Sequence, residues 1–367
     1  MTEPTKDLSK SNLIQQFTII IHKIDVDGGK VAVFKKRQYT DAIKIIKLYP
    51  KDTIDNLDDI KNHFIKNGKK NPTKILLKIQ DFIENGYITQ AKEAMENPLV
   101  KALMNLTKIY AIGPAKAKQL YNKHGITTIE DLRNKFIADP SIINAKQQIG
   151  LKYHNDLEQR IPRTEIDEYN IVLNKICQNI SPDLKMSING SYRRGLETSG
   201  DIDVLITCKN NSNLDTYELR QKLINRLKEN GILQETLASG KKKFMGIVKL
   251  QSKGYNIARH IDIIDTIPEH YPFALLYFTG SGEFNSQMRA IALKQGYSMN
   301  EYRMTHKKTK LPGQPSLRGQ ETVPVSKGTI MGKIGNTRFE HEKDIFIFLD
   351  IKYIQPENRN VITLNKL

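Results

Sequence analysis

Residues 190–207 read GSYRRGLETSGDIDVLIT, and the rest of the chain is arranged around this stretch. A glycine-serine turn comes first, an arginine pair follows, and an acidic pair precedes the apolar run 204–206. The apolar run predicts a buried strand, and because side chains alternate along a strand, Asp201 and Asp203 project to the same side. Two converging carboxylates repel each other unless cations lie between them, and Mg²⁺ prefers oxygen ligands. The stretch therefore predicts a magnesium site.

The turn ahead of the acids carries groups suited to a phosphate. Glycine allows the main chain to approach a ligand closely, so Gly190 and Ser191 can offer backbone N–H groups and a hydroxyl. Arg193 and Arg194 are expected to neutralise further phosphate charge. An Asp-x-Asp pair by itself also occurs at solvated strand ends, and only its combination with the Gly-Ser turn makes a metal and nucleotide site the preferred interpretation.

This combination is the signature of nucleotidyltransferases, and the string GSYRRGLETSGDIDVL closely resembles the palm motif of family X DNA polymerases, the family of DNA polymerase β. The resemblance implies a third acid on a later strand, a place taken by Asp262 in RHIDIID. Asp265 competes for this role, but it has the opposite strand parity to Asp262. The resemblance further implies that Asp201 and Asp203 bind two Mg²⁺ ions, that Asp262 joins them at the catalytic ion, and that Mn²⁺ can substitute.

Composition limits the class of protein. A chain of 367 residues with 39% hydrophobic content has room for two or three domains with cores of their own. Cys177 and Cys208 stand far apart without CxxC spacing, so neither a disulfide framework nor a zinc site is indicated. No apolar run reaches the length of a membrane span and the N-terminus lacks a secretory signal, so we expect an intracellular protein without a membrane partner. A formal charge of +17 favours nucleic acid as the partner.

The N-terminal part has helical patterns. Residues 1–12 are polar, and we expect a mobile tail there. Between residues 13 and 96 the apolar residues recur at helical spacing, as in TKILLKIQDF, which predicts a small helical domain. Lys74 and Lys78 lie four residues apart on one face of this last helix. Taken alone, such a pair is typical of a solvated face.

The segment is similar to the lyase domain of family X polymerases, which implies that Lys78 attacks the sugar aldehyde of an abasic 5′ end. Such a lysine must lose its proton, so cationic neighbours or burial have to lower its pKa. By the same resemblance, Lys35, Lys66 and Lys74 contact the DNA 5′-phosphate, and Tyr39 takes the place of a pocket tyrosine. The N-terminal domain is therefore expected to have 5′-deoxyribose-phosphate lyase activity.

Residues 97–154 form a second helical unit in this interpretation. The string IYAIGPAKAKQLYNKHGITTIEDL resembles a helix-hairpin-helix, with a turn at Ile112 and Gly113 followed by a new helix. Such a turn aims main-chain N–H groups at a DNA phosphate, and Lys116 and Lys118 would add positive charge. An ordinary helix-loop-helix connection is the alternative.

The remaining chain is expected to hold a catalytic palm with a mixed β-sheet over residues 155–267 and a small nucleotide-selecting α/β subdomain over residues 268–367, so that the whole is an α+β protein. The string YFTGSGEFNSQMRAIALKQGYSMNEY carries the resemblance through this subdomain, and a basic exposed loop is predicted at 306–328. The implied nucleotide contacts are Arg160, Gly190, Ser191, Arg194, Ser199, Gly200, Tyr277, Phe278, Gly280 and Asn285. The implied DNA contacts are Lys243, otherwise a solvated hairpin lysine, and Arg289.

Several residues depart from the family pattern. The stretch GKKNPT at 68–73 replaces a glycine-rich turn, and Gln90 stands where a further lysine of the lyase pocket is expected. His260 stands in place of an arginine near the primer end. Ile264 replaces a basic partner of the acidic pair.

We therefore predict a DNA-directed DNA polymerase that fills short gaps in base excision repair by two-metal nucleotidyl transfer. Its partners would be gapped or nicked duplex DNA and dNTPs, and it would be a monomer, with binding to repair proteins left open. The nucleus and a viral replication compartment both stay open as its location. The rivals are a template-independent terminal transferase and a catalytically dead scaffold that binds DNA ends. The helix-hairpin-helix and YFTG strings favour templating, and the three acids argue against a dead site.

Overall fold

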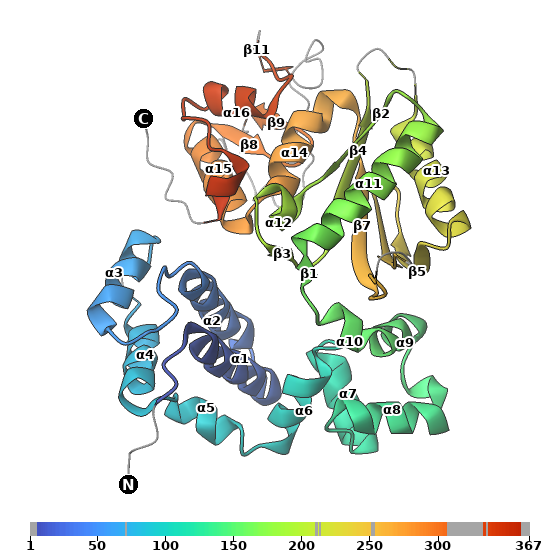
Figure 1. The fold of residues 1–367 in the computed structure, drawn as a ribbon. Coiled ribbons are helices and arrows are strands. Elements are labelled where there is room, and N and C mark those ends of the chain that lie inside the picture. Colours follow the sequence, from blue (N-terminus) through green and yellow to red (C-terminus); the bar gives the residue numbers. More distant parts are fainter. Residues whose placement is uncertain are drawn as a thin grey trace, which may run out of the picture. The chain divides into compact units, whose positions relative to one another are not determined.

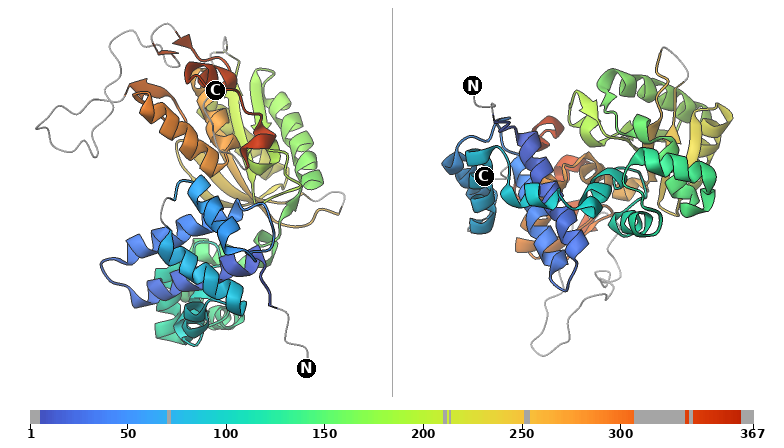
Figure 2. Two further views of the ribbon diagram at one scale, coloured as in Figure 1. Left: turned by 90° about the vertical axis from the view of Figure 1, so that its left-hand side faces the viewer. Right: turned by 90° about the horizontal axis from the view of Figure 1, so that it is seen from below.

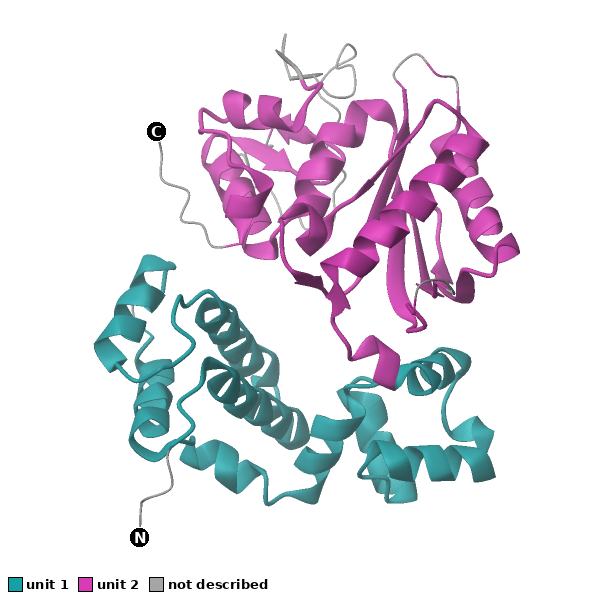
Figure 3. Ribbon diagram, in the orientation of Figure 1, with its two compact units in different colours: residues 1–154 teal, residues 155–367 magenta. Residues whose placement is uncertain are grey.

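The computed structural model divides into two compact units, residues 1–154 and residues 155–367 (Figure 3). In the part of the chain that it describes, no helix is long and apolar enough to cross a membrane. The described residues are 6–69, 72–209, 212, 214–250, 254–306, 333–334 and 337–360. Most of the loop expected at 306–328 therefore lies outside the described residues.

The first half of unit 1 is a helical bundle (Figure 1). Its core is formed by Leu13, Phe17, Ile20, Phe64 and Phe82, all of them buried. The helices are α1 (Lys10–Asp27), α2 (Ala32–Lys47), α3 (Leu57–Lys66), α4 (Thr73–Asn85), α5 (Thr89–Ala94) and α6 (Pro98–Leu106).

Residues 10–12, which were expected to belong to a mobile tail, instead form the beginning of α1. The Ser9 hydroxyl accepts a hydrogen bond from the Asn12 N–H, and the helix begins at Lys10. This hydrogen bond satisfies one of the free N–H groups of the first turn, so it favours a helix start inside a polar stretch.

The second half of unit 1 has its own core, which includes Leu103, Leu106, Leu120 and Leu132. Its helices after α6 are α7 (Pro114–His124), α8 (Ile129–Ala138), η1 (Pro140–Ile142) and α9 (Ala145–Lys152), and α10 (His154–Leu157) spans the boundary to unit 2. Gly113 is the N-cap of α7 and a proline follows it, so the helix starts where the sequence predicts.

Unit 2 is built on a mixed sheet whose described strands run in the order β2-β4-β7-β6-β5. The pair β4-β7 is parallel and the other neighbours are antiparallel. Helices α11 and α13 lie on one face of the sheet (Figures 1 and 2). The elements are α11 (Arg163–Ile180), β2 (Leu184–Ile188), β4 (Ile202–Cys208), α13 (Thr216–Glu229), β5 (Leu233–Ser239), β6 (Lys243–Val248) and β7 (Arg259–Asp265).

Alternate residues of β4 pack on opposite faces of this sheet. Val204 and Ile206 join the core formed with α11 and α13, whereas Leu205 packs with Ile264 and with Ala274 of α14 (Tyr271–Thr279). Because the strand alternates, the acids at 201 and 203 share the face of Leu205. The sheet therefore presents its acids on the face opposite to α11 and α13.

The C-terminal part is a small α/β assembly, and with it the expected α+β class is confirmed. Its described elements are η2 (Pro268–His270), α14, α15 (Gly282–Lys294), β8 (Tyr297–Met299), β9 (Met304–His306), β10 (Lys333–Ile334), β11 (Thr337–Arg338), α16 (Glu342–Phe348) and η3 (Pro356–Arg359). Asp350, just beyond the end of α16, has a positive φ of 51°.

Candidate active site

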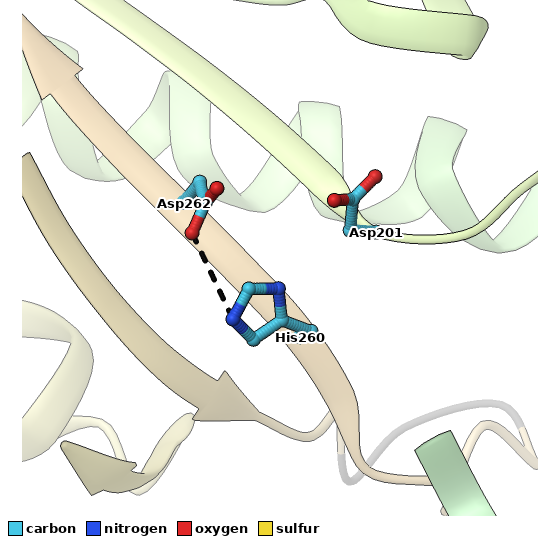
Figure 4. A group of neighbouring side chains, drawn as sticks. All are labelled: Asp201, His260 and Asp262. Atoms are coloured by element: carbon cyan, nitrogen blue, oxygen red, sulfur yellow. Dashed lines mark ion pairs between the residues drawn. The ribbon is translucent and has the colours of Figure 1, made fainter. Parts of the chain in front are cut away.

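The acidic residues meet at one end of the parallel strand pair. Asp203 of β4 is the register partner of Asp262 of β7, and Asp201 directly precedes β4. One ligand atom from each of Asp201, His260 and Asp262 lies within 4.8 Å of the others, an arrangement that can hold a metal ion (Figure 4). The expected third acid is thus beside the first two. His260, which the sequence suggested only as a replaced arginine, joins the cluster.

The competing acid, Asp265, lies on the other face of the sheet. Its carboxylate forms an ion pair with Arg220 of α13 at 2.6 Å, and the Arg220 side chain is fully buried. Strand parity accounts for this separation, because residues three apart on a strand point to opposite faces.

The charge of the cluster is incompletely compensated. Burial, followed by the repulsion of Asp201 and Asp262, raises the pKa of Asp203, and burial with the repulsion of Asp262 raises that of Asp201. Lys243 Nζ lies 2.5 Å from Asp262 Oδ2, and His260 Nε2 lies 3.7 Å from Asp262 Oδ1. No hydrogen-bond donor in the described part of the chain reaches the buried Asp262 Oδ1. Such clustered, partly uncompensated oxygens fit a hard divalent cation.

Gly190 is held against one of these carboxylates. It opens α12 (Gly190–Arg193) with a φ of +59°, so the expected glycine-serine turn is the first turn of a short helix. A Cβ at this position would lie 2.1 Å from Asp203 Oδ2. The Asn189 N–H also donates to the Asp203 carbonyl at 2.7 Å. Glycine is therefore required here both by backbone conformation and by space.

A cavity of about 590 Å³ opens beside the acids. It brings together nine of the ten residues expected to bind the nucleotide, and also two of the acids. Its lining is Arg160, Gly190, Ser191, Arg194, Leu196, Gly200, Asp201, Asp203, Tyr277, Phe278, Gly280, Ser281, Gly282, Glu283 and Asn285. Four further lining residues were not predicted, although all of them stand within the two motif strings: Leu196, Ser281, Gly282 and Glu283.

The tenth residue, Ser199, does not line the cavity. It belongs to the short strand β3 (Thr198–Ser199), which pairs with β1 (Ile161–Pro162), and it is 1% exposed. The Ser191 hydroxyl donates to the Ser199 hydroxyl at 2.8 Å. Ser199 thus holds a lining hydroxyl from behind, and its own contact with the nucleotide stays a prediction.

The two arginines of the motif diverge. Arg194 lines the cavity, where its guanidinium donates to the Thr279 carbonyl at 2.7 Å and to Asn360 Oδ1 at 2.6 Å. Arg193 instead forms an ion pair with the buried Glu342 at 3.0 Å. The expectation that Arg193 neutralises phosphate charge is therefore wrong for this structure, because its guanidinium is engaged by the C-terminal part of unit 2.

The wall of the cavity formed by α14 and α15 is fixed by local contacts. Asn285 Nδ2 donates to the Tyr277 carbonyl at 2.7 Å, and the Tyr277 and Phe278 rings pack edge to face at 5.0 Å. The Arg289 guanidinium lies 5.1 Å from the Tyr277 ring centroid. The peptide bond between Gly280 and Ser281 is cis. Arg160, which also lines the cavity, is held by Thr198, to whose carbonyl it donates at 2.7 Å.

In unit 1 the predicted lyase residue is half-buried. Lys78 Nζ donates to Gln90 Oε1 at 2.5 Å, and burial lowers its pKa. The residue that replaces an expected lysine is thus its hydrogen-bond partner. Lys74 lines a separate cavity of about 400 Å³. Lys35 and Lys66 are exposed, and Tyr39 packs its ring 5.6 Å from that of Phe17.

The helix-hairpin-helix candidates are only partly available to DNA. The Ile112 side chain is 3% exposed and belongs to the core, so only its main chain is open to a DNA contact. Lys116 Nζ donates to the Ile142 carbonyl at 2.5 Å, and Lys118 Nζ donates to the carbonyls of Asp25 and Val26. These ammonium groups cap main-chain carbonyls, a use that residue type and spacing do not disclose.

The fold and site define a class, the nucleotidyltransferase palm, in which a glycine-serine helix start and strand-borne acids share one cavity. Family models agree: residues 160–269 match the DNA polymerase beta palm, 274–360 the DNA polymerase beta thumb and 104–158 the fingers domain of DNA polymerase lambda. The chain therefore belongs to the family X DNA polymerases.

Curated relatives agree with this assignment. The chain is 28% identical to a DNA polymerase lambda of Arabidopsis thaliana, over 88% of this chain and 57% of the relative. It is 29% identical to one from Rattus norvegicus, over 77% of this chain and 46% of the relative. A DNA nucleotidylexotransferase of Gallus gallus is 25% identical over 77% of this chain and 56% of the relative. The matched regions thus span about half the length of these relatives.

Proposed function

We propose that the chain is a DNA-directed DNA polymerase that fills short gaps in DNA during base excision repair. The observation that carries the proposal is the parallel register of Asp203 with Asp262, beside Asp201 and the cavity lined by Arg160 and Arg194. Carboxylates grouped in this way suit divalent cations, and the arginines suit a triphosphate. Kinship to two DNA polymerases named lambda supports the same activity.

The acids would hold two Mg²⁺ ions, for which Mn²⁺ can substitute. Bound there, such ions supply Lewis acidity at the primer hydroxyl and the leaving oxygens. Asp262 is the carboxylate that accepts the proton of the primer 3′-hydroxyl. Ser191, Arg160 and Arg194 bind the triphosphate and offset the charge that develops on pyrophosphate.

The α14 wall would select the sugar. Tyr277 and Phe278 line the cavity next to Gly280, where a main-chain segment packed against the sugar excludes a 2′-hydroxyl by steric clash. Asn285 and Arg289 would contact the base pair and the template strand. The substrates are then dNTPs and gapped or nicked duplex DNA, bound by a monomer in the nucleus or in a viral replication compartment.

A lyase step in unit 1 completes this proposal. Half-buried Lys78, with its lowered pKa, is the nucleophile for the 5′-deoxyribose phosphate left at a gap. The exposed Lys35, Lys66 and Lys74, together with Tyr39, would bind the 5′-phosphate, and the main chain at Ile112 and Gly113 would bind a backbone phosphate.

Primer extension on a one-nucleotide-gapped duplex with Mg²⁺ tests the polymerase activity. Each dNTP is offered separately, and Asp262→Ala serves as the inactive control. Addition of only the complementary nucleotide, lost in the variant, is the expected outcome. No addition by the wild-type protein despite tight DNA binding would contradict the proposal and favour a scaffold.

A second candidate function is template-independent nucleotide addition. The similarity to a DNA nucleotidylexotransferase favours it, since that relative matches over 77% of this chain. The same gapped duplex separates the two, because a terminal transferase would add any of the four nucleotides irrespective of the template base.

A further inference from the structure

Lys243 carries a positive charge into the acid cluster from the neighbouring strand. It is the register partner of Ile264, and Met245 of the same strand is the partner of Asp262. Residues opposite each other in an antiparallel pair share a face, so Lys243 lies on the face of the acids and diagonally next to Asp262. Its ammonium reaches Asp262 Oδ2 at 2.5 Å.

This ion pair occupies one of the two Asp262 oxygens that could bind a divalent cation. One Asp262 oxygen faces Lys243, and the other lies 3.7 Å from His260 Nε2. Among the other basic groups near the cavity, Arg194 binds the Thr279 carbonyl and Arg160 binds Thr198. Lys243 is therefore the ammonium that has to move for Asp262 to bind metal through both oxygens.

Lys243 has a way out of the cluster. Its side chain is 41% exposed, whereas that of Asp262 is 10% exposed. A flexible four-carbon stem lets an ammonium exchange one anion for another at small cost in geometry. A DNA phosphate next to β6 offers such an anion, and only in the bound state.

We propose that Lys243 is an exchangeable counter-ion: it neutralises Asp262 in the free protein and passes to a DNA phosphate in the complex, so that DNA binding and divalent-metal binding favour each other. The inference rests on the proposed polymerase function. It also implies an order of binding, because the acids acquire their full metal affinity only after DNA has bound. By linkage, metal must tighten DNA binding by the same factor.

The adjacent lysine provides a matched control. Lys242 has the same charge and lies on the same hairpin, but its ammonium lies 4.1 Å from the Tyr302 ring centroid. Lys242→Met and Lys243→Met therefore change the net charge equally. A general electrostatic effect would change the metal affinity of both variants. The exchange of Lys243 between Asp262 and a DNA phosphate predicts a change of metal affinity in Lys243→Met alone.

Mn²⁺ binding to the 367-residue chain tests the proposal. The electron paramagnetic resonance signal of free Mn²⁺ measures this binding, first without DNA and then with gapped DNA, after subtraction of a DNA-only blank. Without DNA, Lys243→Met is expected to bind Mn²⁺ about tenfold more tightly than the wild type. Lys242→Met is expected to match the wild type, and Lys243→Arg to keep its weak binding. Gapped DNA should tighten Mn²⁺ binding to the wild type but not to Lys243→Met.

Equal shifts in the two methionine variants, or no shift in Lys243→Met, would overturn the proposal. If Lys243→Met does not fold, the wild-type comparison with and without DNA decides, because equal Mn²⁺ affinity in the two states rules out the exchange. Failure of the polymerase function looks different: the wild type would then extend no primer, whatever its Mn²⁺ affinity. If the wild type extends primers but Lys243→Met binds Mn²⁺ no more tightly than the wild type, only the counter-ion role of Lys243 is refuted.

Discussion

Asp203 and Asp262 are direct partners across the parallel β4-β7 pair, so both carboxylates emerge from the same face of the sheet. Lys243 pairs with Asp262 at 2.5 Å, whereas burial and the repulsion of Asp201 and Asp262 raise the pKa of Asp203. A protein that keeps two such groups side by side holds an electrostatic strain that a bound cation relieves.

Neutralising Asp262 should abolish catalysis without disturbing the fold. Asp262→Asn keeps the shape of the side chain but removes the charge and the proton acceptor, so we expect the rate of nucleotide incorporation to fall by at least about 10²–10³-fold. Single-turnover incorporation on gapped DNA measures this rate. Asp183→Asn is the control, because Asp183 forms an exposed ion pair with Lys209 and should leave the rate unchanged. A variant rate within threefold of the wild type would exclude Asp262 from the chemistry.

Adding a methyl group at Gly190 should damage both the site and its stability. In Gly190→Ala the new Cβ would have to displace Asp203 Oδ2, only 2.1 Å away, and the backbone would keep a positive φ. We expect a near-complete loss of incorporation, with a lower free energy of unfolding in urea.

Gly296→Ala separates the effect of the positive φ from the effect of the steric clash with Asp203. Gly296 has a φ of +86°, and a Cβ at this position would meet no atom within 4 Å, so its substitution carries only the conformational cost of about 1–2 kcal/mol. Incorporation by Gly296→Ala should stay near the wild-type rate. If the two variants lose stability and activity alike, the contact with Asp203 is not what requires glycine at position 190.

The sequence was sufficient to predict the acids and most of the cavity because each signal is local. Alternation on one strand aligns Asp201 with Asp203, and the motif strings contain nearly all of the lining residues. Asp262 was predicted through a family resemblance, and its register with Asp203 depends on a crossover between β4 and β7 that periodicity cannot specify.

Sequence reasoning failed where a charged side chain has a distant partner. Arg193 pairs with Glu342, and Lys118 caps carbonyls at the end of α1. His260 entered the acid cluster because β7 carries it to the same face as Asp262. In each case the residue type is compatible with phosphate binding or with a structural contact, and only the tertiary packing decides between them.

The buried ion pair of Arg220 with Asp265 should be a structural support rather than part of the chemistry. Asp265→Asn leaves the fully buried Arg220 guanidinium without its counter-ion, so we expect a loss of about 3–5 kcal/mol in the free energy of unfolding. The double variant Arg220→Leu/Asp265→Leu should recover much of this loss. Urea unfolding of the three proteins measures both effects.

A surface pair provides the comparison for that experiment. The Arg226 guanidinium lies 2.8 Å from Glu229 Oε2, but the two side chains are 60% and 59% exposed. Glu229→Gln should therefore cost no more than about 0–1 kcal/mol. Equal losses in Asp265→Asn and Glu229→Gln would mean that burial does not strengthen the Arg220 contact.

Schiff-base formation by Lys78 should follow the pKa of its ammonium group. Burial lowers this pKa, so the neutral amine should appear at a lower pH than the ordinary lysine pKa of about 10.4 predicts. Borohydride trapping on DNA with a 5′-deoxyribose phosphate, measured against pH, should rise through that lowered value and vanish in Lys78→Ala. Gln90→Glu should shift the rise to higher pH, because an anion next to the ammonium stabilises the protonated form, whereas Gln90→Leu should shift it lower by removing the acceptor. Trapping that persists in Lys78→Ala, or the same midpoint in both Gln90 variants, would assign the nucleophile to another residue.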